Sequence, residues 1–277
     1  DYKDPNNGLE IKSCPPIVDS GFEVTESPKQ DQVQGLQKYQ SKYLKKEFKN
    51  YFLKRMKNML PSAFGYVEGS GFFYGVNMLL RTLIPQQLYH PKKKQNSSYE
   101  RLCNPDIDHK HEKSQLSLEE KTGIVKSAFQ LTGWQNFAKL IVFAGHGGHS
   151  KNNPFNSSLD CGACAGSPGR HNARMLAELA NDKKVRDLLK KEGFVIPYDT
   201  FFIGAEHNTT TDEIVLFDSE IPESHQKELD QLKADLVLAQ RSATQERLGN
   251  DEKSVVAAHR KTNDWSETRP EWGLAKN

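Results

Sequence analysis

The stretch 139–174 constrains the fold of this chain more than any other. It begins with the apolar run 140–144, a pattern that predicts a buried strand. A glycine-rich turn with two histidines follows at once, and a polar loop leads to Asp160 and a Cys-x-x-Cys pair. A helix is predicted to begin soon after Pro168. Soft metal ligands at the carboxyl end of a strand, ahead of a helix N-terminus, are typical of a functional site.

Strands and helices alternate from residue 138 onward, which predicts the α/β class. A helix that starts with Ser117 and early acidic residues should run to about Thr132, where Gly133 closes it. Further helices are predicted over 172–181, 183–192 and 222–248, and strands over 200–205 and 213–217.

The first part of the chain is more polar and less regular. Residues 1–30 predict an extended arm with little periodicity. Residues 34–60 predict a helix with one apolar and one lysine-rich face. That lysine-rich face could meet an anionic membrane or an acidic partner. We favour the simpler interpretation, a solvated face on a helix packed against the core.

A second helix is predicted over 64–84. It is almost long enough to cross a bilayer, but Glu68, Asn77 and Arg81 interrupt it. We therefore expect a buried helix, in which four glycines allow close backbone approach. A polar connector over 86–115 follows. Its Asp/His cluster at 106–111 could bind a metal, but a charged loop is the favoured interpretation.

The chain has four cysteines, no secretory signal and no uninterrupted run of 18 apolar residues. These features favour a reducing, cytosolic setting, where Cys-x-x-Cys is more often metal-binding or redox-active than a structural disulfide. The formal net charge of +2 neither favours nor excludes nucleic acid, and no nucleic acid is among the partners we expect.

Four side chains of the central stretch have the spacing His-x2-His-x11-Cys-x2-Cys: His146, His149, Cys161 and Cys164. Two imidazoles and two thiolates suit tetrahedral zinc, either as a closed structural site or as an open one that lowers the pKa of a bound water to about 7. Cys161 as a nucleophile with His146 as base, and a redox Cys-x-x-Cys, remain alternatives. The glycine-rich turn matches neither nucleotide-binding fingerprint.

Three segments, GHGGHSKNNPFNSSLDCGACAG, HNTTTDEI and WSETRPEWGLAKN, resemble the DabA family of probable inorganic carbon transporter subunits. The resemblance implies a β-carbonic-anhydrase-like sheet with flanking helices, preceded by a mainly helical region. It implies a Zn²⁺ site for vectorial hydration of CO2 to bicarbonate. It also implies a peripheral protein on the cytoplasmic face of the bacterial inner membrane, bound to the antiporter-like membrane subunit DabB.

The resemblance also ranks the ligands. In the family, a Cys and an Asp of an upstream Cys-x-Asp-x-Arg motif and a downstream His and Cys hold the zinc. The downstream pair corresponds to His146 and Cys161, which leaves His149, Asp160 and Cys164 as neighbours or alternative ligands. The upstream motif does not occur in these 277 residues.

We therefore expect an internal piece with half of the zinc site, and a division into an arm (1–30), a helical region (31–115) and an α/β zinc-site domain (116–277). CO2 hydration is expected only in the full-length protein within its complex. The alternative is a non-catalytic structural zinc module for protein docking. No catalytic side chain is predicted.

Overall fold

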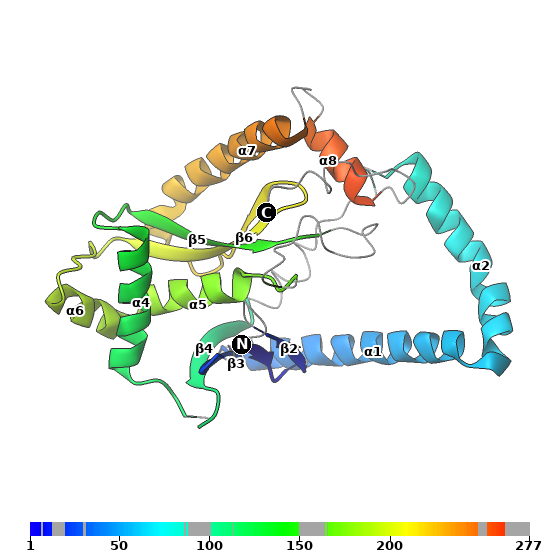
Figure 1. Ribbon diagram of the computed structural model, residues 1–277, viewed down its shortest axis with the longest axis horizontal. Coiled ribbons are helices and arrows are strands. Elements are labelled where there is room, and N and C mark those ends of the chain that lie inside the picture. Colours follow the sequence, from blue (N-terminus) through cyan, green and yellow to red (C-terminus); the bar gives the residue numbers. More distant parts are fainter. Residues whose placement is uncertain are drawn as a thin grey trace.

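The computed structural model describes residues 1–6, 8–12, 20–29, 32–85, 87, 101–112, 114–149, 164, 166–248 and 254–263. Within these ranges the chain is a mixed α/β protein with two small sheets and several helices (Figure 1). The predicted α/β class is confirmed at that level.

One sheet, here the site sheet, has the order β5-β6-β7. Its strands are β5 (Leu140–Gly147), β6 (Phe201–Asn208) and β7 (Glu213–Leu216). β5 runs parallel to β6, whereas β7 is antiparallel to β6. All three strands were predicted, and β5 and β6 each extend three residues beyond the predicted end. The extensions carry the glycine–histidine turn and the segment 206–208 into the sheet.

The other sheet, here the N-terminal sheet, has the order β2-β1-β3-β4. Its strands are β1 (Tyr2–Asp4), β2 (Leu9–Ile11), β3 (Phe22–Pro28) and β4 (Cys103–His109). The structure thus differs from the extended arm and the polar connector that we expected. On β4, alternate residues are buried while acidic side chains cover the other face, which made the strand resemble a charged loop. The domain boundaries stay predictions.

The helices that flank the sheets are capped as predicted. Helix α4 (Leu118–Thr132) has a capping box between Ser117 and Glu120 and ends at Gly133, whose φ is 70°. The Asp182 side chain accepts hydrogen bonds from the first turn of α6 (Lys183–Lys191). A 3₁₀ turn (Glu223–His225) precedes α7 (Gln226–Leu248), and α8 (Ser254–Asn263) follows.

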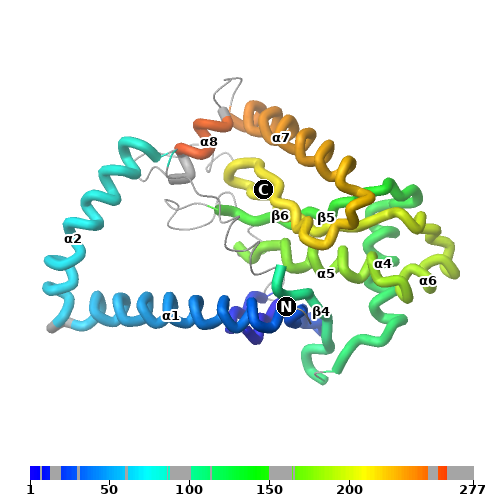
Figure 2. Tube along the Cα trace, turned by 180° about the vertical axis from the view of Figure 1, so that it is seen from behind, coloured from blue at the N-terminus to red at the C-terminus, as the bar shows by residue number. Residues whose placement is uncertain are grey.

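Helix α5 (Arg170–Asn181) lies between the two sheets and contacts both of them (Figures 1 and 2). The main core is built around Phe129 of α4, which is fully buried and packs against Phe202, Trp134 and Phe194. This core fixes the site sheet and α5 relative to each other.

Helix α1 (Val33–Asn58) runs away from both sheets, and helix α2 (Leu60–Leu83) turns at the far end of α1 and lies apart from the sheets (Figure 2). The predicted helix over 34–60 is confirmed, but Leu36 is the one residue of α1 described as buried, so most of α1 does not pack against the core.

The prediction that the second helix is buried is wrong. Its apolar side chains are exposed, for example Phe64 at 77% and Phe72 at 75%. A Cβ added to any of its four glycines would meet no described atom within 4 Å beyond the backbone of the helix itself. The side chains of α2 are exposed because, among the described elements, the main contact of α2 is with α1 and not with a sheet. Among the described helices, each is too short or too polar to span a bilayer.

Candidate metal centre

The candidate site lies where the end of β5 meets the start of α5. Gly145 touches the helix start so closely that a Cβ there would lie 2.6 Å from the Arg170 nitrogen, and closer still to the Gly169 carbonyl. The Gly169 N–H also donates a hydrogen bond of 2.7 Å to the His146 carbonyl. Only glycine permits this approach, so the glycine-rich turn serves to bring His146 against the helix N-terminus.

His146 and Cys164 are brought together at this point. The His146 Nε2 atom lies 3.3 Å from the Cys164 Sγ atom. Two such ligands of one tetrahedral zinc would be about 3.5 Å apart, given Zn–N and Zn–S bonds of about 2.0 and 2.3 Å. The pair therefore fits zinc in spacing, and it would fit in donor type if Cys164 were a thiolate. Cys164 is disulfide-bonded in this structure, and a thiolate ligand would require its reduction.

His149 turns to a different partner. Its Nε2 atom makes a short contact with the Glu206 carboxylate, and its backbone N–H donates to Thr210 Oγ1 at 3.0 Å. Glu206 is 3% exposed and also faces Arg170, whose Nη1 lies 3.3 Å from Oε2. Glu206 therefore lies between one imidazole and one guanidinium, directly behind the glycine–histidine turn.

Only part of the predicted ligand set thus lies among the residues that the structure describes. Asp160 and Cys161 lie outside the described residues. Within the described ranges, no group of three or more His, Cys, Asp or Glu side chains is arranged to hold a metal ion. His146 and Cys164 fit one side of a zinc site, and any further ligands must come from elsewhere.

The segment HNTTTDEI forms the end of β6 and the turn into β7. Its Asp212 has a φ of 58° and receives hydrogen bonds from Thr244 (2.8 Å) and from Arg247 Nη2 (2.7 Å). Burial alone would raise the pKa of Asp212, but hydrogen bonds from His207, Arg247 and Thr244 lower that pKa below its usual value. Asp212 thus ties α7 to the edge of the site.

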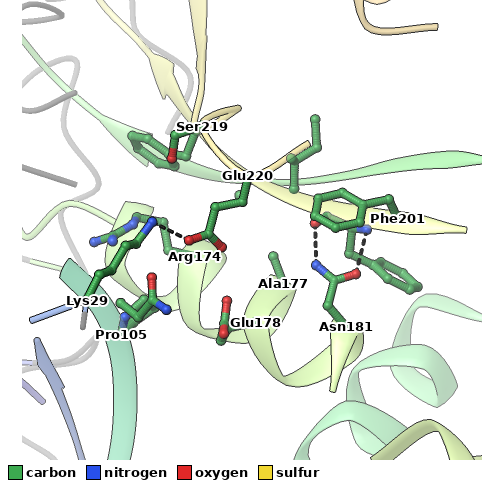
Figure 3. Close-up of a pocket in the computed structure, with 14 residues that line it drawn as sticks. Lys29, Pro105, Arg174, Ala177, Glu178, Asn181, Phe201, Ser219 and Glu220 are labelled. Carbon is green, nitrogen blue, oxygen red and sulfur yellow. Dashed lines mark hydrogen bonds and ion pairs between the residues drawn. The ribbon is translucent and has the colours of Figure 1, made fainter. Parts of the chain in front are cut away.

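A pocket of about 50 Å³ lies beside α5, away from the candidate metal centre (Figure 3). Lys29 and Glu220 form an ion pair across it, and the Asn181 side chain bonds the Phe202 backbone. Beside it, Arg174 pairs with the fully buried Glu26 of the N-terminal sheet. These charges neutralise one another, so we interpret this pocket as part of the packing between α5 and the two sheets.

Glu206 and His171 were not predicted as site residues, although the start of α5 soon after Pro168 was predicted. The predicted strand over 200–205 ended three residues before the observed end of β6, which left Glu206 outside the strand. A carboxylate at the carboxyl end of a strand parallel to β5 would have been the signal. His171 was overlooked because it is at the first turn of a helix and belongs to no motif.

Comparison with known proteins gives a consistent picture. The family model described as "Probable inorganic carbon transporter subunit DabA" matches residues 1–277. Curated relatives with that name include those of Haloarcula marismortui (40% identical, 100% of this chain and 36% of the relative), Natronomonas pharaonis (42%, 96% and 34%) and Salinibacter ruber (40%, 96% and 36%).

The chain thus spans about a third of the length of these relatives. Comparison with solved structures found no significant match.

Proposed function

Because this chain belongs to the family of probable inorganic carbon transporter subunits DabA, we propose that it supplies one side of a zinc site in a protein of inorganic carbon uptake. The observation that carries the proposal is the contact between His146 and Cys164 at the end of β5, built by the close approach of Gly145 to Gly169.

The proposed site gives each residue a role. His146 provides an imidazole held by its strand, and the thiolate comes from Cys161 or from Cys164, the latter only after reduction of its disulfide. By the family resemblance the thiolate ligand is Cys161; the contact with His146 supports Cys164 as the alternative. When bound, zinc would supply a Lewis acid that lowers the pKa of a bound water to about 7.

The wider function is also a proposal. We infer a β-carbonic-anhydrase-like zinc domain in which CO2 is hydrated to bicarbonate, in complex with the membrane subunit DabB at the cytoplasmic face of the membrane. The relatives' printed names support a part in inorganic carbon transport. The exposed apolar side chains of α2 are suited to contact with another protein surface.

Uptake of labelled bicarbonate tests this function. Cells that express the complete protein with its membrane partner should accumulate label, and His146→Ala should abolish the accumulation. The exposed His111, changed to Ala, is the matched control and should leave uptake unchanged. Full uptake by the His146→Ala variant would refute the proposed role of the site.

One observation favours a second candidate, a structural zinc module. The His149 Nδ1 atom is buried without a hydrogen-bond partner in the described structure, while its Nε2 atom contacts a carboxylate. A metal-bound histidine typically binds the metal through one ring nitrogen and contacts a carboxylate through the other. If His149 is a ligand of a closed site with His146 and the two cysteines, His149→Ala should remove zinc and destabilise the fold. Normal zinc content in that variant would eliminate the module.

A further inference from the structure

A small pocket adjoins the candidate metal centre at the N-terminus of α5. It has a volume of about 70 Å³, and the residues of its wall include His146, Cys164, His171, Tyr2 and Lys12. We call it the α5 pocket. A water molecule occupies about 30 Å³ in the liquid, so the pocket suits a ligand of only a few heavy atoms.

His171 is the unusual residue of this pocket. It is 6% exposed, and its ring stacks on the Tyr2 ring with the centroids 3.5 Å apart. Neither ring nitrogen has a hydrogen-bond partner in the described structure. A buried polar atom left unpaired destabilises the fold, so an apolar ring would be the more stable choice for packing alone. A ligand in the pocket would supply the missing partner.

The surroundings of His171 favour an anion. Helix α5 has 12 residues, and its N-cap, Gly169, has no side chain to satisfy the first backbone N–H groups. No acidic residue lies in the first turn. The positive end of the helix dipole and the Lys12 ammonium therefore act on the same small volume. The one acidic side chain in the wall, Asp1, is paired with Lys110 at 2.6 Å.

The protonation state of His171 further restricts which anion the pocket can bind. Burial, and then the charges of Arg170 and Arg174, lower the pKa of His171 well below its usual value. The ring is thus neutral near pH 7 and presents one N–H donor and one acceptor nitrogen. Bicarbonate carries both an O–H donor and acceptor oxygens, so it can pair with either ring nitrogen, whereas nitrate can only accept.

We propose that the α5 pocket binds bicarbonate, held by a hydrogen bond with the His171 ring and by the charges of Lys12 and the α5 N-terminus. The choice of bicarbonate among small oxyanions rests on the proposed function, because the pocket shares His146 with the candidate metal centre. Anion binding itself requires no metal, so it can be tested apart from zinc.

The test is binding of ¹³C-bicarbonate to the complete protein after zinc removal with a chelator, followed by NMR line broadening. The wild type should bind saturably and should prefer bicarbonate to nitrate at least tenfold. His171→Phe, which keeps the ring stack, should weaken bicarbonate binding at least tenfold. Lys12→Gln should weaken it several-fold, while Lys183→Gln, which removes an exposed charge at the start of α6, should have no effect.

Urea unfolding of the same variants gives the second measurement. His171→Phe should be at least as stable as the wild type, because the His171 ring nitrogens have no partner in the described structure. The proposal is overturned if His171→Phe binds bicarbonate like the wild type, if it is clearly less stable, or if the folded wild type binds no bicarbonate. Binding that depends on His171 in a protein without carbon uptake would uphold this site and refute only the proposed function.

Discussion

The contact between Gly145 and the start of α5 makes the strongest prediction of this structure. In Gly145→Ala, the new Cβ would lie 2.6 Å from the Arg170 nitrogen and closer still to the Gly169 carbonyl. Real Cβ atoms essentially never approach another atom within 3.0 Å, and all of these neighbours are backbone atoms that no rotamer change can move. The start of α5 must therefore retreat from β5.

The cost follows from the packing. Overpacking of a dense interior typically costs 1–3 kcal/mol, and we expect the upper end, about 3 kcal/mol, because the displaced atoms belong to a helix that contacts both sheets. The retreat would also separate His146 from Cys164, so zinc affinity should fall together with stability.

The assay is urea unfolding followed by circular dichroism, with Gly123→Ala as the matched control. Gly123 lies within α4, and a Cβ there would have no other atom within 4 Å. The control should be more stable than the wild type by about 0.5–1 kcal/mol, because alanine favours the helix. A Gly145→Ala protein with wild-type stability would refute the close approach of β5 and α5.

Three further predictions concern other parts of the chain. Asp212→Asn should destabilise the fold by about 2 kcal/mol at pH 7, since asparagine tolerates the left-handed backbone but lacks the charge. Because the folded pKa of Asp212 is lowered, its contribution is present above the unfolded pKa of about 3.9 and is lost as the pH falls through the folded pKa, so unfolding curves of the two proteins should converge once the pH is below that folded pKa. Glu206→Gln, which leaves the shape but removes the charge between His149 and Arg170, should destabilise the protein by about 2–3 kcal/mol in urea unfolding, and an unchanged midpoint would contradict the buried pairing. Changing both Phe72 and Phe73 to Ser should leave the unfolding midpoint unchanged and reduce self-association in light scattering, because both rings are more than 70% exposed; a lowered midpoint would mean that α2 is covered by the chain itself.

Local signals in the sequence were sufficient for the elements near the site. The Ser117 cap, the Gly133 stop and the apolar run of β5 each act through neighbouring residues, and the structure confirms all three. The exposure of α2 had no such signal. An apolar helix with glycines has the same sequence whether its partner belongs to the same chain or to another surface, and periodicity cannot tell the two apart.

The site was predictable only where its signals lie in neighbouring residues. His146 stands out because glycines flank it and a strand precedes it. The role of Glu206 and the isolation of the His171 ring depend on which segments meet in space, namely β5 with β6 and α5 with β1. The spacing of His and Cys residues does not report contacts between distant segments. It therefore could not distinguish His149, which contacts Glu206, from His146, which contacts Cys164.

The zinc content of the complete protein, purified under reducing conditions, tests the central claim most directly. Elemental analysis should give one zinc per chain for the wild type, and His146→Gln should lose it, whereas the control His111→Gln should keep it. Air oxidation should also release the metal, because a disulfide at Cys164 provides no thiolate. A His146→Gln protein that retains its zinc would contradict the assignment of this site.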